Sequence, residues 1–144
     1  MVGIWFNSWQ PGPAGRHGAG DDPGGTAVVS ITEFTSHRPW TMIGVCVAGL
    51  ALRRAWPDLD GVVGMWLWTA PGLMRPRSGA VSVWRDEEAL RRFVGRRDHL
   101  RIMRSYRHRG AMRSTMWRTE RFDRTAVREA AHAILAGRSA WPSP

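Results

Sequence analysis

One segment near the middle of the chain is apolar on both of its alternating faces, and this restricts the possible folds more than any other feature. Residues 61–69 read GVVGMWLWT, a β-branched and aromatic run that predicts a strand. Trp66 and Trp68 lie on one face of that strand, whereas Met65 and Leu67 lie on the other. A strand with one solvent-exposed face would alternate apolar with polar residues. We therefore expect both faces of the sheet to be covered.

The remaining pattern alternates short strands with helices. Asp86 is expected to cap a helix that is interrupted at residues 95–97, and Asp98 to cap its continuation to about Arg107. We expect strands at residues 26–35, 61–69, 80–84 and 111–119, a first helix at 40–55, and a last helix between Asp123 and Gly137. The order β-α-β-β-α-β predicts an α+β fold of the ferredoxin-like kind: a four-stranded antiparallel sheet with helices on one face, and an extra C-terminal helix.

The fourth predicted strand repeats the two-sided apolar pattern. Met112 and Met116 lie opposite Thr115 and Trp117. If the helices cover one face of the sheet, something else must cover the other. A second copy packed sheet to sheet is the simplest cover, because symmetric homodimers are the commonest oligomers. The expected assembly is therefore a homodimer in which two sheets form a dimeric α+β barrel.

Composition changes abruptly at both ends of this pattern. Residues 1–25 are rich in glycine and proline and are expected to form a flexible N-terminal tail. The barrel domain is predicted at 26–138, and residues 139–144 form a short C-terminal tail. Trp5, Phe6 and Trp9 are an apolar cluster inside the first tail, which either docks onto the domain or a partner, or stays loose.

Charge, apolar run length and cysteine content indicate which classes of protein are disfavoured. The net charge is +9, and all 21 basic residues are arginine. The arginines are spread at helical spacing without a compact cluster among exposed aromatics, so binding to nucleic acid is disfavoured. No apolar run reaches the roughly 18 residues needed to span a bilayer. The single cysteine, Cys46, is expected to be a buried, inert thiol. Together these features favour a cytoplasmic protein.

The segment around the third strand and the helix after it resembles a known superfamily. Residues 83–93 read VWRDEEALRRF, and His99 and Met103 follow. This run is similar to the dimeric α+β barrel superfamily, which includes antibiotic biosynthesis monooxygenases, heme-degrading monooxygenases and spheroidene monooxygenase-like proteins. Two departures matter. The only asparagine is Asn7, in the tail, and Met103 stands where heme degraders carry their iron-ligating histidine. The heme-degrading mechanism is therefore not transferred.

Few residues have the pattern of a catalytic site. The five histidines show no metal-ligand spacing, and there is no phosphate-binding loop or nucleophile elbow. His99, Met103 and Tyr106 fall at i, i+4 and i+7 and so share one helix stripe. His99 is the candidate to remove a substrate proton and Tyr106 to orient its oxygen. The ordinary alternative is an amphipathic helix edge with a half-buried histidine. The candidate substrate-binding residues are Met103, Trp66, Trp68 and Trp84, followed by His37 and Trp40 at the start of the first helix.

The resemblance implies a monooxygenase-like enzyme of bacterial secondary metabolism. Its substrate would be a hydrophobic polycyclic aromatic or isoprenoid molecule held between sheet and helices. The chemistry would be cofactor-free, or heme-dependent with His99 as the axial ligand. Two alternatives remain open: a non-redox cyclase, dehydratase or isomerase of the same fold, and a non-catalytic accessory dimer that binds a ligand.

Overall fold

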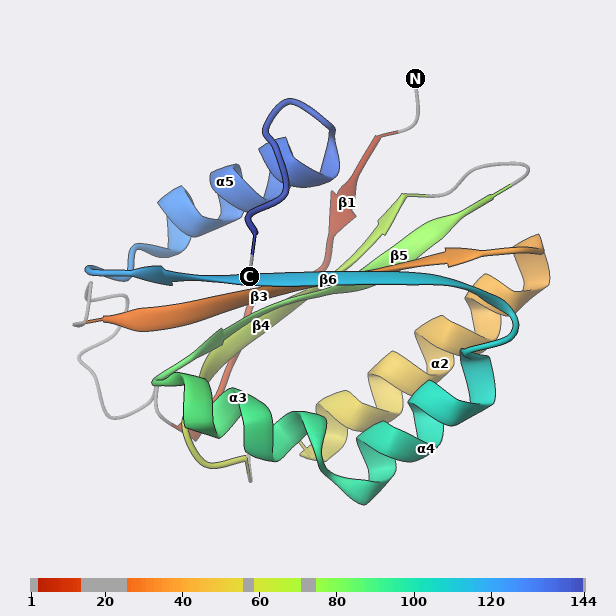
Figure 1. Ribbon diagram of the computed structural model, residues 1–144, viewed down its shortest axis with the longest axis horizontal. Helices are drawn as coiled ribbons and strands as arrows, with labels where there is room; N and C mark the ends of the chain where they lie inside the picture. The colour runs from red at the N-terminus through yellow and green to blue at the C-terminus, as the bar shows by residue number, and fades with distance from the viewer. Residues whose placement is uncertain (1–2, 14–25, 56–58, 71–74, 144) are drawn as a thin grey trace.

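The computed structural model describes residues 3–13, 26–55, 59–70 and 75–143 (Figure 1). Its strands are β1 (Trp5–Phe6), β2 (Gln10–Pro11), β3 (Ala27–Ser36), β4 (Val62–Ala70), β5 (Arg77–Trp84) and β6 (Gly110–Thr119). Its helices are α2 (Pro39–Ala55), α3 (Glu87–Val94), α4 (Arg97–Tyr106) and α5 (Arg124–Leu135). Every strand and helix expected from the sequence is present, with ends shifted by a few residues.

The sheet has the predicted ferredoxin-like topology. Its strand order is β1-β4-β5-β3-β6, with β2 also paired to β4. All of these pairings are antiparallel. Within the four long strands, β3 lies between β5 and β6, so the first long strand of the chain is central. The α+β fold class predicted from the sequence is confirmed.

Helices cover both faces of the sheet, which corrects the sequence analysis. α2, α3 and α4 lie on one side, and α5 lies on the other (Figure 1). α5 packs there because four of its side chains form a buried apolar stripe, namely Val127, Ala131, Ile134 and Leu135. That stripe joins the core with residues of three strands, among them Val29, Ile31, Trp66, Trp68, Val81 and Val83. The premise that the helices cover only one face was wrong for α5.

The N-terminal segment completes the cover on the α5 side. Ile4, Phe6 and Trp9 pack against that core. The indole of Trp9 occupies the space that a Cβ on Gly64 would need, and its ring centroid lies 4.4 Å from that of Trp66. Residues 3–13 are therefore an added sheet edge and an apolar cover, not a tail, while residues 14–25 lie outside the described part of the chain. The predicted homodimer thus loses its simplest argument, and it stays a prediction.

Of the two predicted caps, the one at Asp86 is correct, and Asp123, where the last helix was expected to start, is a cap as well. The Asp86 carboxylate accepts a hydrogen bond from the Ala89 N–H at 2.8 Å, and Asp123 caps α5 through Ala126 N at 3.0 Å. The cap predicted at Asp98 is wrong. α4 begins two residues earlier than expected, at Arg97, with Arg96 at its N-cap and no side-chain cap. Asp98 therefore lies inside the first turn of α4 and not at its cap.

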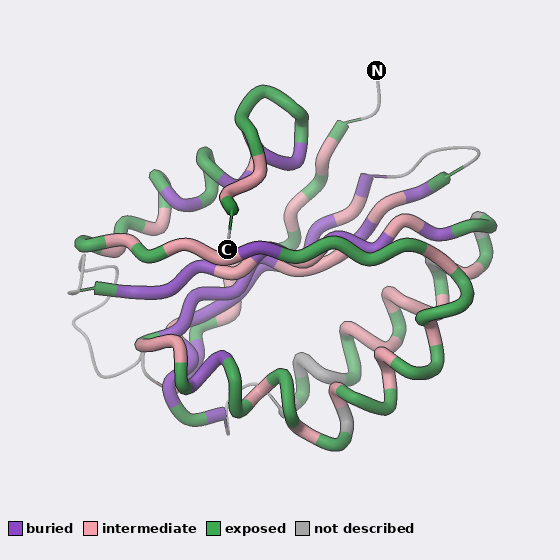
Figure 2. Tube along the Cα trace, in the orientation of Figure 1, coloured by how far each residue is buried: buried purple, intermediate pink, exposed green. Residues whose placement is uncertain are grey.

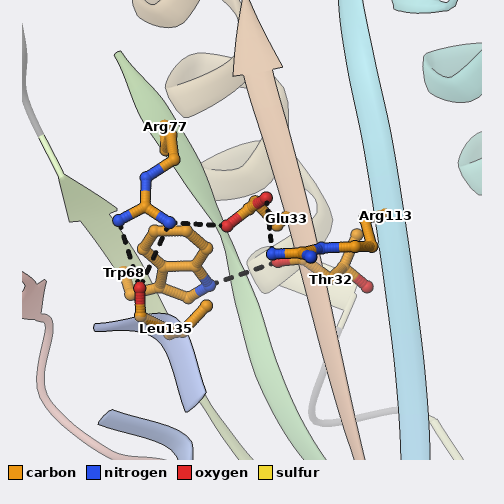
Figure 3. A network of polar contacts seen from close by, with 6 residues as sticks. All are labelled: Thr32, Glu33, Trp68, Arg77, Arg113 and Leu135. Carbon is orange, nitrogen blue, oxygen red and sulfur yellow. Dashed lines mark hydrogen bonds and ion pairs between the residues drawn. The ribbon is translucent and has the colours of Figure 1, made fainter. Parts of the chain in front are cut away.

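A polar network ties the end of α5 to the sheet (Figure 3). Arg77 donates to Glu33 at 2.7 Å and to the backbone oxygen of Leu135 at 3.2 Å. Arg113 donates to the other oxygen of Glu33 at 3.4 Å. Burying a carboxylate is costly unless cations and hydrogen bonds compensate it, and here two arginines do so.

The C-terminal residues lie along β6 rather than away from the domain. Thr115 donates from its hydroxyl to the backbone oxygen of Pro142 at 2.6 Å. The guanidinium of Arg113 stacks on the ring of Trp141 at 3.7 Å from its centroid. Two of the residues expected to form a C-terminal tail are thus held against the edge strand. Among the described residues, no helix is long and apolar enough to cross a membrane.

Candidate functional site

Small hydroxyl side chains line the helix-facing side of the sheet. Even-numbered residues of β3 lie on this side, since their neighbours Val29 and Ile31 pack toward α5. Ser30 is paired with Ser82 and Met116, and Thr32 with Ala80 and Ser114. Such short side chains fill little of the space between a sheet and the helices above it. The middle of β3 therefore presents short polar side chains toward α2 and α4.

Two of these hydroxyls are buried without a hydrogen-bond partner. The side-chain oxygens of Ser36 and Ser78 have none within the described part of the molecule. Ser36 is fully buried, and Ser78 is paired with Phe34 across the sheet. A buried polar group without a partner is unfavourable, and such groups are often satisfied by a ligand or a water. This pair marks the β3–β5 end of the face as able to accept a polar group.

Two of the three helices above this face, α2 and α4, bury little of their surface. α5, on the other side, buries four of its twelve residues. By contrast, none of the described side chains of α2 or α4 is buried; all are half-buried or exposed (Figure 2). An apolar layer that buries so little against the sheet holds weakly to it, because burial is the main stabilising contribution.

His99 faces this layer from the first turns of α4 and is half-buried. Its Nδ1 lies 3.1 Å from the backbone oxygen of Val94, and its ring packs on Phe93 with centroids 4.8 Å apart. A carbonyl can only accept, so this contact assigns the proton to Nδ1 in the neutral ring. Nε2 is then the basic nitrogen, which is the state that a proton acceptor needs.

Tyr106 lies at the other end of the same helix. Its ring makes an edge contact with Phe34, at 6.2 Å between centroids. A Cβ on Gly44 of α2 would come within 2.6 Å of the Tyr106 hydroxyl, so the glycine makes room for it. Seven residues of helix separate Tyr106 from His99, or roughly 10 Å. The two side chains are therefore spaced for opposite ends of one flat molecule, with half-buried Met103 between them.

A hollow of about 180 Å³ opens at the α3 end of the layer. Trp84 and Phe93 form its aromatic wall, with ring centroids 5.2 Å apart. The indole N–H of Trp84 donates to the Ser82 hydroxyl at 2.9 Å. Arg92 and Arg96 also line this hollow. Trp84 is thus the one predicted tryptophan that belongs to the same side as His99 and Tyr106.

The structure separates the remaining predicted tryptophans from this site. Trp66 and Trp68 are buried on the opposite side of the sheet, in the core under α5. Trp40 is 63% exposed, and the Arg38 guanidinium lies 5.3 Å from its ring. His37 is exposed at the same helix start. None of these four residues therefore lies beside His99 and Tyr106, and their binding role stays a prediction.

Sequence reasoning missed Phe34, Phe93 and Gly44. Gly44 carried a usable signal, since a glycine inside an apolar helix often marks a close approach. The two phenylalanines look like ordinary core residues in sequence. A second hollow, of about 480 Å³, lies on the α5 side between Trp9, Trp66 and the first turns of α5. It contains none of the predicted catalytic residues.

The residues present do not form an evident cofactor site. Among the described residues, no group of three histidine, cysteine or acidic side chains could hold a metal ion. Burial raises the pKa of the Cys46 thiol, which makes it less reactive. For heme, the tautomer of His99 suits an axial ligand, but Phe93 lies against its ring and the adjoining hollow of about 180 Å³ is smaller than usual ligand pockets. The residues do not fit heme in this arrangement.

Solved structures with a similar fold include proteins described as oxygenases. A candidate monooxygenase from Lactobacillus acidophilus NCFM has a TM-score of 0.56 at 9% identity, covering 72% of this chain and 50% of that one. SnoaB, a cofactor-independent oxygenase from Streptomyces nogalater, matches at a TM-score of 0.49 with 15% identity over 65% of this chain and 92% of that one. A single-residue variant of SnoaB matches at a TM-score of 0.46 with 21% identity, covering 63% of this chain and 90% of that one.

No protein-family model matches this chain, and neither does any curated protein. The fold implied by the resemblance of residues 83–93 is confirmed by the Lactobacillus acidophilus structure. At these identities the likeness establishes the fold alone, because one fold supports many chemistries.

Proposed function

We propose that the protein is a small monooxygenase-like enzyme that acts, without a bound cofactor, on a flat hydrophobic substrate. The substrate would lie between the sheet and the layer of α2 and α4. The observation that carries this proposal is the unequal packing of the two faces: α5 is firmly buried, whereas α2 and α4 bury none of their described side chains. A polycyclic aromatic or isoprenoid substrate of secondary metabolism suits such an apolar, adaptable layer.

The positions of the side chains support the following roles. Nε2 of His99 accepts a proton from an acidic C–H of the substrate, because Nδ1 is held by the Val94 carbonyl. The Tyr106 hydroxyl and the unpartnered hydroxyls of Ser36 and Ser78 are the polar groups that would hold the substrate oxygen at the other end. Excluding water from this layer would strengthen these hydrogen bonds.

The overall reaction balances with dioxygen as the sole oxidant. Deprotonation of a methylene next to an aromatic ketone gives a carbanion, which transfers electrons to dioxygen. One oxygen atom becomes the new carbonyl oxygen of the substrate. The other oxygen atom leaves as water, together with the two hydrogens of the methylene. The enzyme contributes proton transfer and positioning, and the substrate itself supplies the electrons.

Oxygen consumption with anthrone, a flat ketone with an acidic methylene, tests this function. We expect turnover by the wild type, a loss of about 100-fold or more in His99→Ala, and a smaller loss in Tyr106→Phe. His108→Ala is the matched control, since His108 is exposed beyond the end of α4. Binding, followed by quenching of tryptophan fluorescence, should survive in both site variants.

Other results would assign the protein to the alternative classes. Conversion of a ligand without oxygen consumption would indicate a cyclase, dehydratase or isomerase. Ligand binding with no conversion by the wild type would indicate a binding protein. Equal activity of His99→Ala, Tyr106→Phe and His108→Ala would reject the site.

A further inference from the structure

α2 is apolar on every side, although it lies on the surface. Its residues 41–52 read TMIGVCVAGLAL, with a single polar side chain, Thr41. A helix that is hydrophobic all round is normally buried. Here only the sheet-facing side is partly covered, where Gly44 meets Tyr106 and Gly49 approaches Leu67. The outer side of α2 has no cover from the described residues.

That outer side presents a continuous apolar row, which we name the α2 stripe. It consists of Trp40, Ile43, Val47 and Leu50, which are 63%, 67%, 61% and 46% exposed. Their spacing of three, four and three residues places them on one line about 15 Å long. Among the residues whose burial the structure describes, eight large apolar ones are exposed, and six of them lie on α2, α3 and α4, including Val94 and Leu100. Exposed apolar surface gathered on one layer marks an interaction site.

The neighbouring helix adds positive charge to the same outer surface. Arg97, Arg101 and Arg104 are exposed and follow helical spacing on α4. They lie on the side away from the sheet, because His99, Met103 and Tyr106 on the opposite side are half-buried. In the part of the chain that the structure describes, none of these three guanidinium groups makes an ion pair. Arg38, at the start of α2, lies over Trp40.

We propose that the α2 stripe and the α4 arginines dock the protein onto an anionic lipid surface. Such a surface supplies an apolar layer for the stripe and acidic headgroups for the arginines. It also accepts a convex row of side chains without a complementary groove. A second copy fits less well, since its own α4 arginines would be brought next to these. The proposal concerns binding alone and does not depend on any turnover.

The experiment is co-sedimentation of the full chain with vesicles of phosphatidylcholine, with and without phosphatidylglycerol. We expect binding to the anionic vesicles only, weakening as salt rises. Trp40→Ser combined with Ile43→Ser should lower the partition coefficient at least about tenfold. Arg101→Gln and Arg104→Gln should each lower it about fivefold. Substitutions at these exposed positions are expected to leave the melting temperature nearly unchanged.

Matched controls separate this surface from general stickiness. Trp5→Ser combined with Met112→Ser removes apolar residues that are 66% and 42% exposed outside the helical layer. Arg121→Gln combined with Arg138→Gln removes two exposed charges near the ends of α5. Both controls should bind like the wild type. Equal effects of control and stripe variants, or binding to neutral vesicles alone, would reject the proposal. So would a dimer that depends on Trp40, which would assign the stripe to a second copy, or binding only to an acidic protein.

Discussion

The indole N–H of Trp68 donates to the backbone oxygen of Thr32 at 3.2 Å, although the two residues lie on strands that are not neighbours (Figure 3). β5 runs between them, and the indole crosses it at Gly79, which is paired with both Trp68 and Glu33. A Cβ on Gly79 would collide with the Thr32 oxygen and come within 3.0 Å of the indole nitrogen. The glycine is therefore what permits the bond.

Gly79→Ala is accordingly expected to destabilise the protein. The collision is with backbone, which cannot give way as a flexible side chain can, and overpacking of this kind costs about 1–3 kcal/mol. Urea unfolding followed by tryptophan fluorescence measures the change. Gly95→Ala is the control, because the nearest atom there is 3.5 Å away and the residue has an ordinary φ of −82°. A stability equal to the wild type in Gly79→Ala would contradict this account.

Glu33 and Glu88 should respond very differently to loss of charge. The Glu33 side chain is 9% exposed between Arg77 and Arg113, whereas that of Glu88 is 80% exposed and lies 4.0 Å from Arg92. Glu33→Gln leaves two partly covered guanidinium groups with a weaker partner, and we expect a loss of about 1–2 kcal/mol in the free energy of unfolding. Glu88→Gln should change it by less than about 0.5 kcal/mol. Chemical denaturation of both variants measures the two changes. The comparison holds if the free energy of unfolding falls with denaturant at the same slope in both.

The cap of α3 predicts a pH dependence. The pKa of the Asp86 carboxyl lies below its ordinary value, chiefly because the Ala89 N–H donates to it, with Arg85 as a smaller cause. The folded state then favours the carboxylate, so this stabilisation is present above the ordinary carboxyl pKa and is lost as pH falls through the lowered one. Asp86→Asn keeps an acceptor for the cap without the charge. We expect the variant to lose less stability than the wild type between neutral pH and acid. The urea midpoint measures the stability at each pH, and an equal loss in both proteins would contradict the role of the Asp86 charge.

Gly64→Ala should release the N-terminal segment while leaving the rest of the domain folded. The added Cβ would overlap the indole of Trp9, which sits against that glycine. Amide exchange reports the release, because Asn7 N–H donates to Leu67 O at 2.8 Å and Gly12 N–H to Val63 O at 2.9 Å. We expect both amides to exchange faster in the variant. Gly49→Ala, where the nearest atom is 3.7 Å away, should leave them unchanged.

Hemin titration tests the cofactor. Since Phe93 packs against the His99 ring at 4.8 Å, we expect no sharp Soret band with a stoichiometric endpoint. A weak, unsaturating change in absorbance would be ordinary adsorption to apolar surface. A stoichiometric band that disappears in His99→Ala would instead show that Phe93 moves aside and that the site does accept heme.

Local signals predicted the long strands and helices, because each carries its own periodicity and turn residues. Asp86 and Asp123 were recognisable as caps for the same reason. The position of α5 was not predictable in this way. Its stripe shows that one side is buried, but not which face of the sheet buries it. The docking of Trp9 was also hidden, since it depends on Gly64, a distant residue whose only contribution is missing volume.

In the candidate site, too, local spacing was predictable and packing between distant residues was not. His99, Met103 and Tyr106 were predicted to share a stripe, and helical spacing alone is enough for that. Trp66 and Trp68 were assigned to the same pocket because nothing in the sequence states which face of β4 the substrate uses. The alternation along β4 places the two tryptophans on one face, but only the packing of α5 shows that this face is covered by α5.

The cover on the α5 side also determines how two copies could pair through their sheets. A partner sheet reaches that face only after α5 and residues 3–13 have left it, and both are attached by segments rather than embedded in the sheet's centre. If two chains exchanged these elements, each would recover the contacts it gave up, at little net cost in free energy. Pairing of this kind would be governed by the rate of opening, so the proportion of paired chains would depend on how a sample had been concentrated and stored.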